Sequence, residues 1–261
     1  MDGRPAVAPP GHAVAVPGRS RPTGGGIVTW TPPEVATSEY ALKRPLDLLL
    51  SGIGLTLAAP IFAAVALAIK LEDRGPVFYT QERVGRNGAR FKLMKFRSMV
   101  PDAEAKTGPV WAAREDPRIT RVGRILRKTA LDELPQLINI FRGDMRFVGP
   151  RSHRVFFYEK FRSVPGYTER YRIHPGLTGL AQVLARYDSS AEQKLRFDLL
   201  YARKQSFGLD TKLILASFLI TFSGKWDERQ GKKLGFVSAF LRRGAGRARS
   251  NGSRRNGHGR A

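Results

Sequence analysis

The longest apolar run of the chain extends from Leu46 to Ile69, and Asp47 is the only charged residue in it. As a straight helix this run would measure roughly 36 Å, which is enough to cross a bilayer. A buried core helix of this length, apolar on all sides, would be unusual. Pro60 divides the run, and the arm from Leu46 to Ala59 would reach only about 21 Å.

Cations flank both ends of this run: Lys43, Arg44, Lys70 and Arg74. The positive-inside rule therefore gives little reason to place the two ends on opposite sides of a membrane. We predict a helix–break–helix hairpin that enters one leaflet and returns, with its break at Pro60. A single spanning helix stays open as the alternative, because proline also occurs in spanning helices.

Beyond this run, apolar and polar residues alternate over short stretches. Residues 77–80 are typical of a strand, and residues 83–88 are typical of a turn between short strands. Residues 91–97 alternate apolar and cationic side chains, as a half-buried strand does. We expect this strand to project three cations around one site, unless they simply face solvent: Lys92, Lys95 and Arg97.

Helical patterns dominate the remainder of the chain. We expect a helix at roughly 129–141, followed by a sharp turn at Gly149–Pro150 that presents Arg151. Residues 189–192 have the pattern of a capping box and open a helix through about Lys204. Residues 209–222 are mostly apolar but short for a spanning helix, and they suit a core helix or a helix lying in the membrane interface.

These patterns predict an α-rich α/β fold with a re-entrant membrane hairpin, short strands and amphipathic interfacial helices. We divide the chain into a disordered leader (1–39), a membrane-inserted segment (40–74), a soluble-looking mixed domain (75–241) and a basic disordered tail (242–261). The leader is rich in Pro, Gly and Ala, lacks periodicity and is not a signal peptide. The tail contains seven arginines and no acid, and either a solvated tail or a tether to an anionic surface fits it.

The formal net charge of +23 indicates an anionic partner, such as nucleic acid, anionic lipid or a phosphorylated substrate. Cysteine is absent, which excludes disulfides, thiolate zinc sites and cysteine nucleophiles. Only four histidines occur and none has HExxH spacing, so a metal site built from histidines is not expected.

An acidic pair, Asp132 and Glu133, lies between two groups of cations: Arg121, Arg124, Arg127 and Lys128 before it, and Arg142, Arg146 and Arg151 after it. A carboxylate in such surroundings stays ionised and can act as a nucleophile or as a Mg²⁺ ligand. The purely structural interpretation places both acids in the first turn of a helix that Thr129 caps, near its positive end. The local pattern alone favours the structural interpretation, whereas the rest of the chain favours the chemical one.

In its motifs and their order, the chain resembles the bacterial sugar transferases, the monotopic phosphoglycosyl transferases that start glycan assembly on a polyprenyl carrier. The matching stretches are KRPLDLLLSGIGLTLAAPIF (43–62), GPVFYTQERVGRNG (75–88), FKLMKFRSM (91–99), RILRKTALDELPQLINIFRGDMRFVGPR (124–151) and HPGLTGLAQV (174–183). They cover most of the chain between the two tails.

The resemblance implies that Asp132 attacks the β-phosphorus of a nucleoside diphosphate sugar, usually a UDP-sugar, and that UMP leaves. Undecaprenyl phosphate would then take the phosphosugar from Asp132, in the first membrane step of polysaccharide or glycoprotein glycan synthesis. Glu133 would position Mg²⁺ together with Asp132. The resemblance also implies phosphate or nucleotide contacts from Lys95, Arg127, Arg151 and His174.

It further implies a protein of the bacterial inner membrane, with its catalytic domain on the cytoplasmic face and anionic lipids around it. Oligomeric state, a homodimer included, stays open, and so do the sugar and the pathway.

The chain departs from the family pattern at four places: Ser152 replaces a proline, His174 an arginine, Leu180 a tryptophan, and Leu184–Ala185 an Asn-Gly pair. None is Asp132 or Glu133, so the reaction class should survive. The departures bear on nucleotide and sugar contacts, above all on the role of His174, which is only partly charged at neutral pH unless a phosphate lies beside it.

Three other interpretations fit the sequence less well. A nucleic-acid binder would explain the charge, but it explains neither the apolar run nor the lack of a nucleic-acid-binding motif. An inactive membrane scaffold of the same fold is disfavoured by the intact Asp132–Glu133 pair. Adjacent acids are also awkward for a glycosidase, whose carboxyl groups must flank the scissile bond about 5–9 Å apart.

Overall fold

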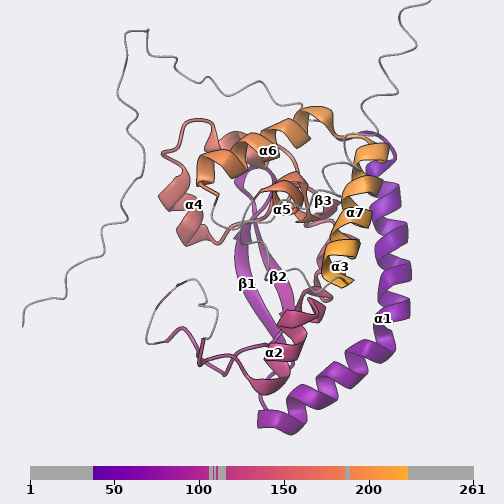
Figure 1. Ribbon diagram of the computed structural model, residues 1–261, viewed down its shortest axis with the longest axis vertical. Helices are drawn as coiled ribbons and strands as arrows, with labels where there is room; N and C mark the ends of the chain where they lie inside the picture. Colours follow the sequence, from indigo (N-terminus) through magenta and orange to yellow (C-terminus); the bar gives the residue numbers. More distant parts are fainter. Residues whose placement is uncertain (1–37, 106–107, 109, 111–115, 186–188, 223–261) are drawn as a thin grey trace, which may run out of the picture. The chain divides into compact units, whose positions relative to one another are not determined.

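The computed structural model describes residues 38–105, 108, 110, 116–185 and 189–222 (Figure 1). The predicted tail and nearly all of the predicted leader lie outside these residues. The helices are α1 (Lys43–Asp73), α2 (Arg121–Lys128), α3 (Gln136–Arg142), α4 (Val155–Phe161), α5 (Leu180–Leu184), α6 (Ala191–Lys204) and α7 (Phe207–Phe222). The strands are β1 (Phe78–Val84), β2 (Arg90–Phe96), β3 (Arg146–Val148) and β4 (Gly176–Thr178). Short 3₁₀ helices are η1 (Arg86–Gly88), η2 (Leu131–Glu133) and η3 (Tyr167–Arg172). The prediction of a helix-rich fold with short strands is therefore confirmed.

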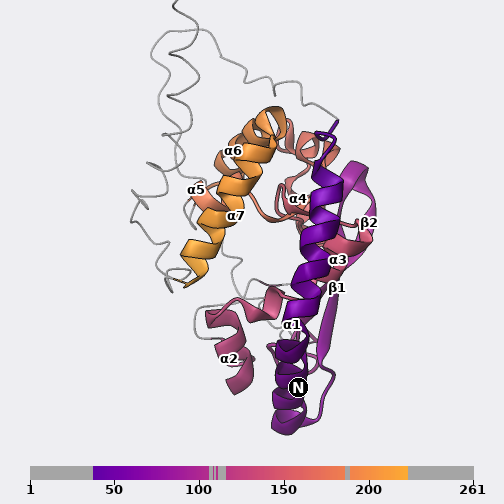
Figure 2. The same cartoon turned by 90° about the vertical axis from the view of Figure 1, so that its right-hand side faces the viewer.

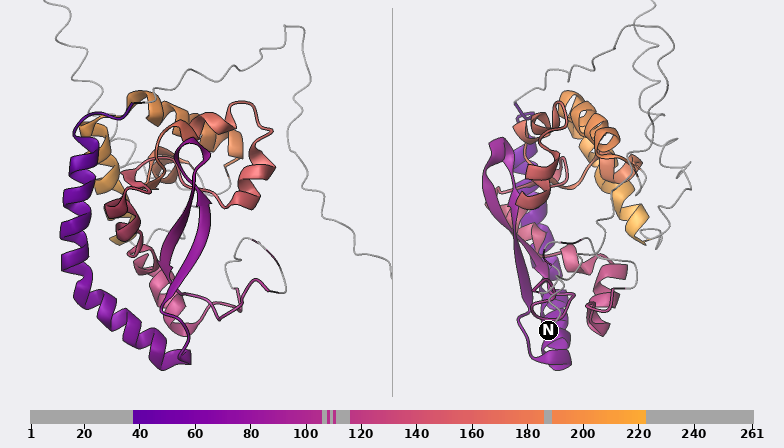
Figure 3. Two further views of the ribbon diagram at one scale, coloured as in Figure 1. Left: turned by 180° about the vertical axis from the view of Figure 1, so that it is seen from behind. Right: turned by 90° about the vertical axis from the view of Figure 1, so that its left-hand side faces the viewer.

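Helix α1 contains the apolar run and, within the described part of the chain, is the one helix long and apolar enough to cross a membrane. Only 17% of its most apolar window is buried against the protein. The helix stays continuous through Pro60 and is bent along its length, most clearly when seen from behind (Figure 3). Proline lacks the N–H that would close the helix and crowds the preceding turn, so it is the physical cause of such a bend. The predicted break thus takes the form of a bend within one helix.

Strands β1 and β2 form an antiparallel hairpin in which Tyr79 lies opposite Lys95. The prediction of strands on either side of a turn is confirmed, although β1 extends further than the apolar pattern indicated. The prediction that three cations of β2 gather around one site is wrong. Lys92 and Lys95 are three positions apart and so lie on opposite faces of the strand. Arg97 lies beyond β2 and forms an ion pair with Asp73 at the end of α1.

The predicted helix at 129–141 is divided in the structure. Helix α2 begins earlier, where the Thr120 side chain accepts a hydrogen bond from the Gly123 N–H, and it ends at Lys128. Thr129 caps the end of α2 and not the start of a new helix. Ala130 then has a left-handed backbone with φ of 56°, which ends the helical course. The chain continues through η2 and resumes as α3 after Pro135.

A buried core holds β3 and β4 against the last two helices. β3 pairs with β4 in parallel, and Gly176 is needed there because an added Cβ would lie 2.0 Å from the Gly149 nitrogen. Helix α6 leads into α7 (Figure 2), and Ser190 caps α6 as the predicted capping box indicated. Both helices contribute buried side chains, among them Leu195, Leu199, Leu213 and Ile220. On α7, Leu215, Phe218 and Leu219 are exposed, so this helix covers the core with one face only.

Candidate active site

The acidic pair is carried by η2, a single turn between α2 and α3. The side chains on either side of the pair, Leu131 and Leu134, pack against the apolar cluster formed by α1, β2 and α2. This packing fixes the turn and directs the acids towards β2. Asp132 is 9% exposed, so it is an almost enclosed carboxylate next to a polar site.

Lys95 and Arg151 converge on Glu133 from two separate parts of the chain. Lys95 Nζ lies 2.7 Å from Glu133 Oε1 and 3.4 Å from Asp132 Oδ2. Arg151 Nη2 lies 3.0 Å from the same Glu133 oxygen. The structure therefore brings together four of the predicted site residues from β2, η2 and the turn after β3.

The two acids have opposite pKa shifts. Burial raises the pKa of Asp132 above its ordinary value, and the charge of Lys95 only partly offsets this. Burial also acts on Glu133, but the charges and hydrogen bonds of Lys95 and Arg151 outweigh it, and the pKa of Glu133 lies well below its ordinary value. Asp132 is thus the more basic carboxylate of the pair. Both acids lie in the first turn of η2, as the structural interpretation expected, although η2 is one turn of 3₁₀ helix and Thr129 ends α2 and does not cap it.

Arg127 lies in the last turn of α2. It is close enough for its charge to lower the pKa of Asp132, although burial remains the larger effect on that group. Arg127 therefore adds positive charge on the Asp132 side of the pair, while Arg151 adds it on the Glu133 side.

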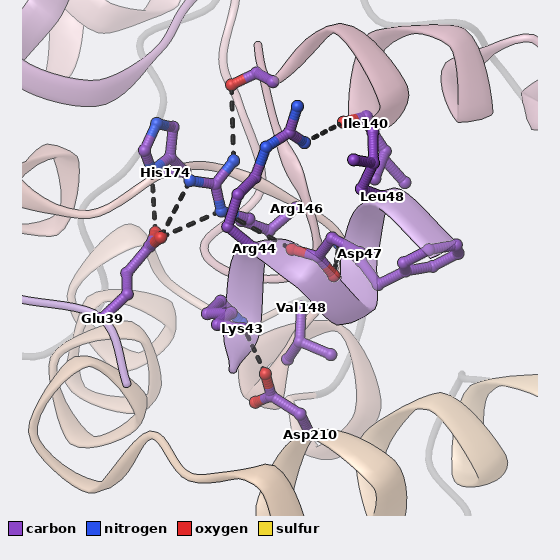
Figure 4. Close-up of polar contacts among 12 residues, drawn as sticks. Glu39, Lys43, Arg44, Asp47, Leu48, Ile140, Arg146, Val148, His174 and Asp210 are labelled. Carbon is purple, nitrogen blue, oxygen red and sulfur yellow. Dashed lines mark hydrogen bonds and ion pairs between the residues drawn. The ribbon is translucent and has the colours of Figure 1, made fainter. Parts of the chain in front are cut away.

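His174 lies in a different polar cluster, which Figure 4 shows beside the start of α1. Its Nδ1 is 2.7 Å from Glu39 Oε1, and Arg146 Nη2 is 2.9 Å from the other oxygen of Glu39. Although burial raises the pKa of Glu39, the hydrogen bonds and charges of these two partners lower it to about 2. The described contacts of His174 do not include Asp132 or Glu133. No sequence pattern indicated Glu39 as its partner.

The same view shows how the start of α1 is fastened to the rest of the protein (Figure 4). Lys43 Nζ lies 2.5 Å from Asp210 Oδ2 of α7, and Tyr201 donates a hydrogen bond to Asp210 Oδ1 at 2.7 Å. Arg44 donates to the carbonyl oxygen of Ile140 at the end of α3. Cations that the sequence placed only as flanks of the apolar run are therefore structural contacts.

The family resemblance implies Mg²⁺, and the donor set can be compared with what this ion requires. The described residues contain no group of three or more His, Cys, Asp or Glu side chains that could hold a metal. However, Mg²⁺ is usually bound through one or two carboxylates plus substrate phosphates and water. Asp132 and Glu133 supply two such carboxylates, so the pair fits Mg²⁺ that arrives with a diphosphate.

Sequence reasoning did not single out Arg83, which lies next to this site. It pairs across an isolated bridge with Arg154, and the Val84 N–H donates to the His153 carbonyl oxygen at 3.0 Å. These contacts join the end of β1 to the segment that follows Arg151. The residue types do not indicate this position of Arg83, because it depends on how the hairpin packs against a segment far along the chain.

Comparisons with known proteins agree on one family. A family model described as bacterial sugar transferase matches residues 38–224. A protein of Bacillus subtilis (strain 168), provisionally named an undecaprenyl-phosphate N-acetylgalactosaminyl 1-phosphate transferase, is 44% identical over 173 residues, which is 66% of this chain and 87% of that protein.

Two further relatives are longer than the matched region. The UDP-glucose:undecaprenyl-phosphate glucose-1-phosphate transferase of Escherichia coli (strain K12) is 41% identical over 70% of this chain and 40% of its own length. The UDP-N-acetylgalactosamine-undecaprenyl-phosphate N-acetylgalactosaminephosphotransferase of Aeromonas hydrophila is 37% identical over 70% of this chain and 44% of its own length. The chain thus spans most of the first relative and less than half of these two.

Proposed function

Because this chain belongs to the bacterial sugar transferase family, we propose that it transfers a sugar 1-phosphate from a UDP-sugar to undecaprenyl phosphate and releases UMP. The relatives named above carry this activity in their names, with glucose or N-acetylgalactosamine as the sugar. The observation that carries the proposal is the pair Asp132 and Glu133, enclosed and set against Lys95 and Arg151. Such a reaction starts the membrane-bound stage of exopolysaccharide, O-antigen, capsule or glycoprotein glycan synthesis.

In the first half of the proposed reaction, an Asp132 carboxylate oxygen forms a bond to the β-phosphorus of the donor. The bond from that phosphorus to the bridging oxygen breaks, and the electron pair leaves with UMP. The raised pKa of Asp132 supports this role, because a more basic carboxylate is a better nucleophile. In the second half, an oxygen of undecaprenyl phosphate attacks the same phosphorus and frees Asp132.

Phosphoryl transfer depends on alignment and charge neutralisation more than on acid–base chemistry. We assign this work to Lys95, Arg127 and Arg151, which surround the acids. Glu133 remains ionised and would hold Mg²⁺ together with Asp132. When bound, Mg²⁺ supplies positive charge to the diphosphate. A substrate contact from His174 remains part of the proposal, and it requires the imidazole to leave Glu39 first.

We further propose that α1 enters the cytoplasmic leaflet of the inner membrane and returns at the bend near Pro60. The exposed apolar side chains of α1, including Leu49, Leu57 and Leu71, support membrane contact. A catalytic domain held in this way would meet the phosphate of a lipid-linked acceptor at the level of the headgroups. The basic surface would add attraction to anionic lipids, at about 1 kcal/mol per cation near the membrane.

The test is release of UMP by the purified, detergent-solubilised chain with Mg²⁺, undecaprenyl phosphate and a panel of UDP-sugars. Release with one sugar, dependent on the lipid, would support the reaction and identify the donor. If folded protein releases no UMP with any donor, the proposed reaction is wrong for these substrates.

A further inference from the structure

Arg83 is a cation beside the candidate active site that has no acidic partner among the described residues. Its Nη1 donates a hydrogen bond to the Ser152 carbonyl oxygen at 3.1 Å. Its Nε is buried and has no hydrogen-bond partner within the part of the chain that the structure describes. Buried N–H groups in folded proteins are nearly always paired, so an unpaired guanidinium N–H at the edge of a site indicates a ligand that completes it.

The other cations close to Arg83 are already paired. Arg151 is paired with Glu133, and Arg154 Nη1 donates to Glu104 Oε1 at 2.8 Å. Burial, followed by the charges of Arg151 and Arg154, lowers the pKa of Arg83 to about 10, while Glu133 acts in the opposite direction. Arg83 is therefore the surplus positive charge of this group, and an anion would relieve its repulsion from its neighbours.

The position of Arg83 relative to the acidic pair indicates which part of a donor it meets. Arg127 acts on Asp132, whereas the acid that acts on Arg83 is Glu133, which Arg151 contacts. In a phosphoryl transfer the attacking and leaving oxygens are roughly in line, on opposite sides of the phosphorus. With Asp132 as the attacking group, the leaving phosphate lies on the side away from Asp132.

We propose that Arg83 binds the α-phosphate of the nucleotide donor, the phosphate that leaves as part of UMP. This inference rests on the proposed function. As the bond between the β-phosphorus and the bridging oxygen breaks, the electron pair moves onto that oxygen of UMP. The guanidinium of Arg83 donates hydrogen bonds to the phosphate that receives this charge.

The experiment compares the binding of UMP and of uridine by isothermal titration calorimetry, using the full chain in detergent with Mg²⁺. The test variant is Arg83→Gln and the matched control is Arg90→Gln. Arg90 lies at the same end of the hairpin, opposite Val84. However, its side chain is 61% exposed, and its Nη1 lies 3.6 Å from Glu82 Oε2. Loss of one charge-assisted contact should weaken UMP binding by about 10- to 100-fold in Arg83→Gln, with uridine binding unchanged and Arg90→Gln like wild type.

An unchanged UMP affinity in Arg83→Gln would overturn the proposal, and so would an equal loss for UMP and uridine, which indicates a damaged site. If Arg83→Gln does not fold, Arg83→Lys is measured instead. Lysine keeps the charge but loses the guanidinium fork, so a selective loss of about fivefold or more for UMP supports the proposal and equal affinity overturns it.

Turnover measured in parallel separates the two proposals. If the wild-type protein releases no UMP, but Arg83→Gln selectively weakens UMP binding, the proposed function is overturned and the phosphate site is retained. Wild-type protein that releases UMP, with full UMP affinity in Arg83→Gln, would overturn the phosphate site alone. Wild-type protein that binds no UMP would overturn the phosphate site, and its turnover alone would decide the proposed function.

Discussion

Asp132 and Glu133 are adjacent in sequence but experience different surroundings. Among the described ion pairs, Glu133 receives both Lys95 and Arg151 on one oxygen, whereas Asp132 has only the longer contact to Lys95. The result is one carboxylate held as an anion by its partners and a second that is more basic because it is enclosed. On the proposed function the two acids therefore take different roles: Asp132 would be the nucleophile and share the Mg²⁺, whereas Glu133 would be a Mg²⁺ ligand only.

We expect Asp132→Asn to lower the rate of UMP release by about 10³-fold or more, because an amide oxygen cannot replace the carboxylate nucleophile. The matched control is Glu192→Gln, an exposed acid in the first turn of α6. Asp132→Asn should remain folded and membrane-bound. Turnover close to wild type in the asparagine variant would remove Asp132 from the role of nucleophile.

Glu39 should make stability depend on pH. Its pKa in the folded protein is about 2, compared with 4.5 ordinarily, so the folded state gains stability from the ionised form above pH 4.5 and loses it as the pH falls towards 2. We expect Glu39→Gln to lower the free energy of unfolding at pH 7 by about 1–2 kcal/mol, after allowance for partial solvent contact.

Denaturant unfolding of wild type and Glu39→Gln at pH 7 and at stepwise lower pH measures this effect. The difference between the two proteins should shrink as the pH falls through 4.5 towards 2. A difference that stays constant over this range would show that the contact with His174 and Arg146 does not depend on the charge of Glu39.

At the scale of elements, α2 is positioned by its close approach to the segment after β2. An added Cβ at Gly123 would lie 2.1 Å from the Ser98 carbonyl oxygen, so only glycine fits. This contact fixes the helix that leads into η2 and carries Arg127. The local backbone, and not a side chain, thus sets the distance between α2 and the rest of the site.

We expect Gly123→Ala to lower the free energy of unfolding by about 1–3 kcal/mol, because the backbone must move to admit a methyl group. Turnover should fall as well, since α2 leads into the acidic pair. Gly208→Ala is the matched control, because nothing lies within 4 Å of its added Cβ and alanine favours the α7 helix. Equal unfolding midpoints for Gly123→Ala and wild type would contradict this account of α2.

The sequence predicted those elements whose signals are local. The apolar run with Pro60 gave α1, the strand-like residues 77–80 gave the start of β1, alternation gave β2, and the capping residue Ser190 gave the start of α6. The division of the predicted 129–141 helix was not foreseen, because it depends on the left-handed backbone of Ala130, and alanine gives no sign of this conformation.

For the site, sequence reasoning identified Asp132, Glu133, Lys95 and Arg151, which the structure brings together. It could not foresee that Glu39 binds His174, or that Arg83 reaches the Ser152 carbonyl oxygen. Both contacts join residues far apart in the chain, and charge patterning within a segment carries no information about them.

At the scale of the whole molecule, the arrangement in the membrane can be tested with engineered cysteines, because the chain has none of its own. We expect Ser38→Cys and Arg90→Cys, on either side of α1, both to be protected from a membrane-impermeant thiol reagent in intact cells. A re-entrant α1 keeps both positions in the cytoplasm. Labelling of only one of them from outside would establish a spanning α1.

The shared pairing of Glu133 with Lys95 and Arg151 also bears on how ligands enter the site. In the free protein these opposite charges neutralise one another, so a lone divalent cation or a lone diphosphate would have to break existing ion pairs. On the proposed function, the acids would hold the metal and the basic side chains would hold the phosphates when both ligands arrive together. Their binding should therefore be cooperative, and by thermodynamic linkage each should tighten the binding of the other by the same factor.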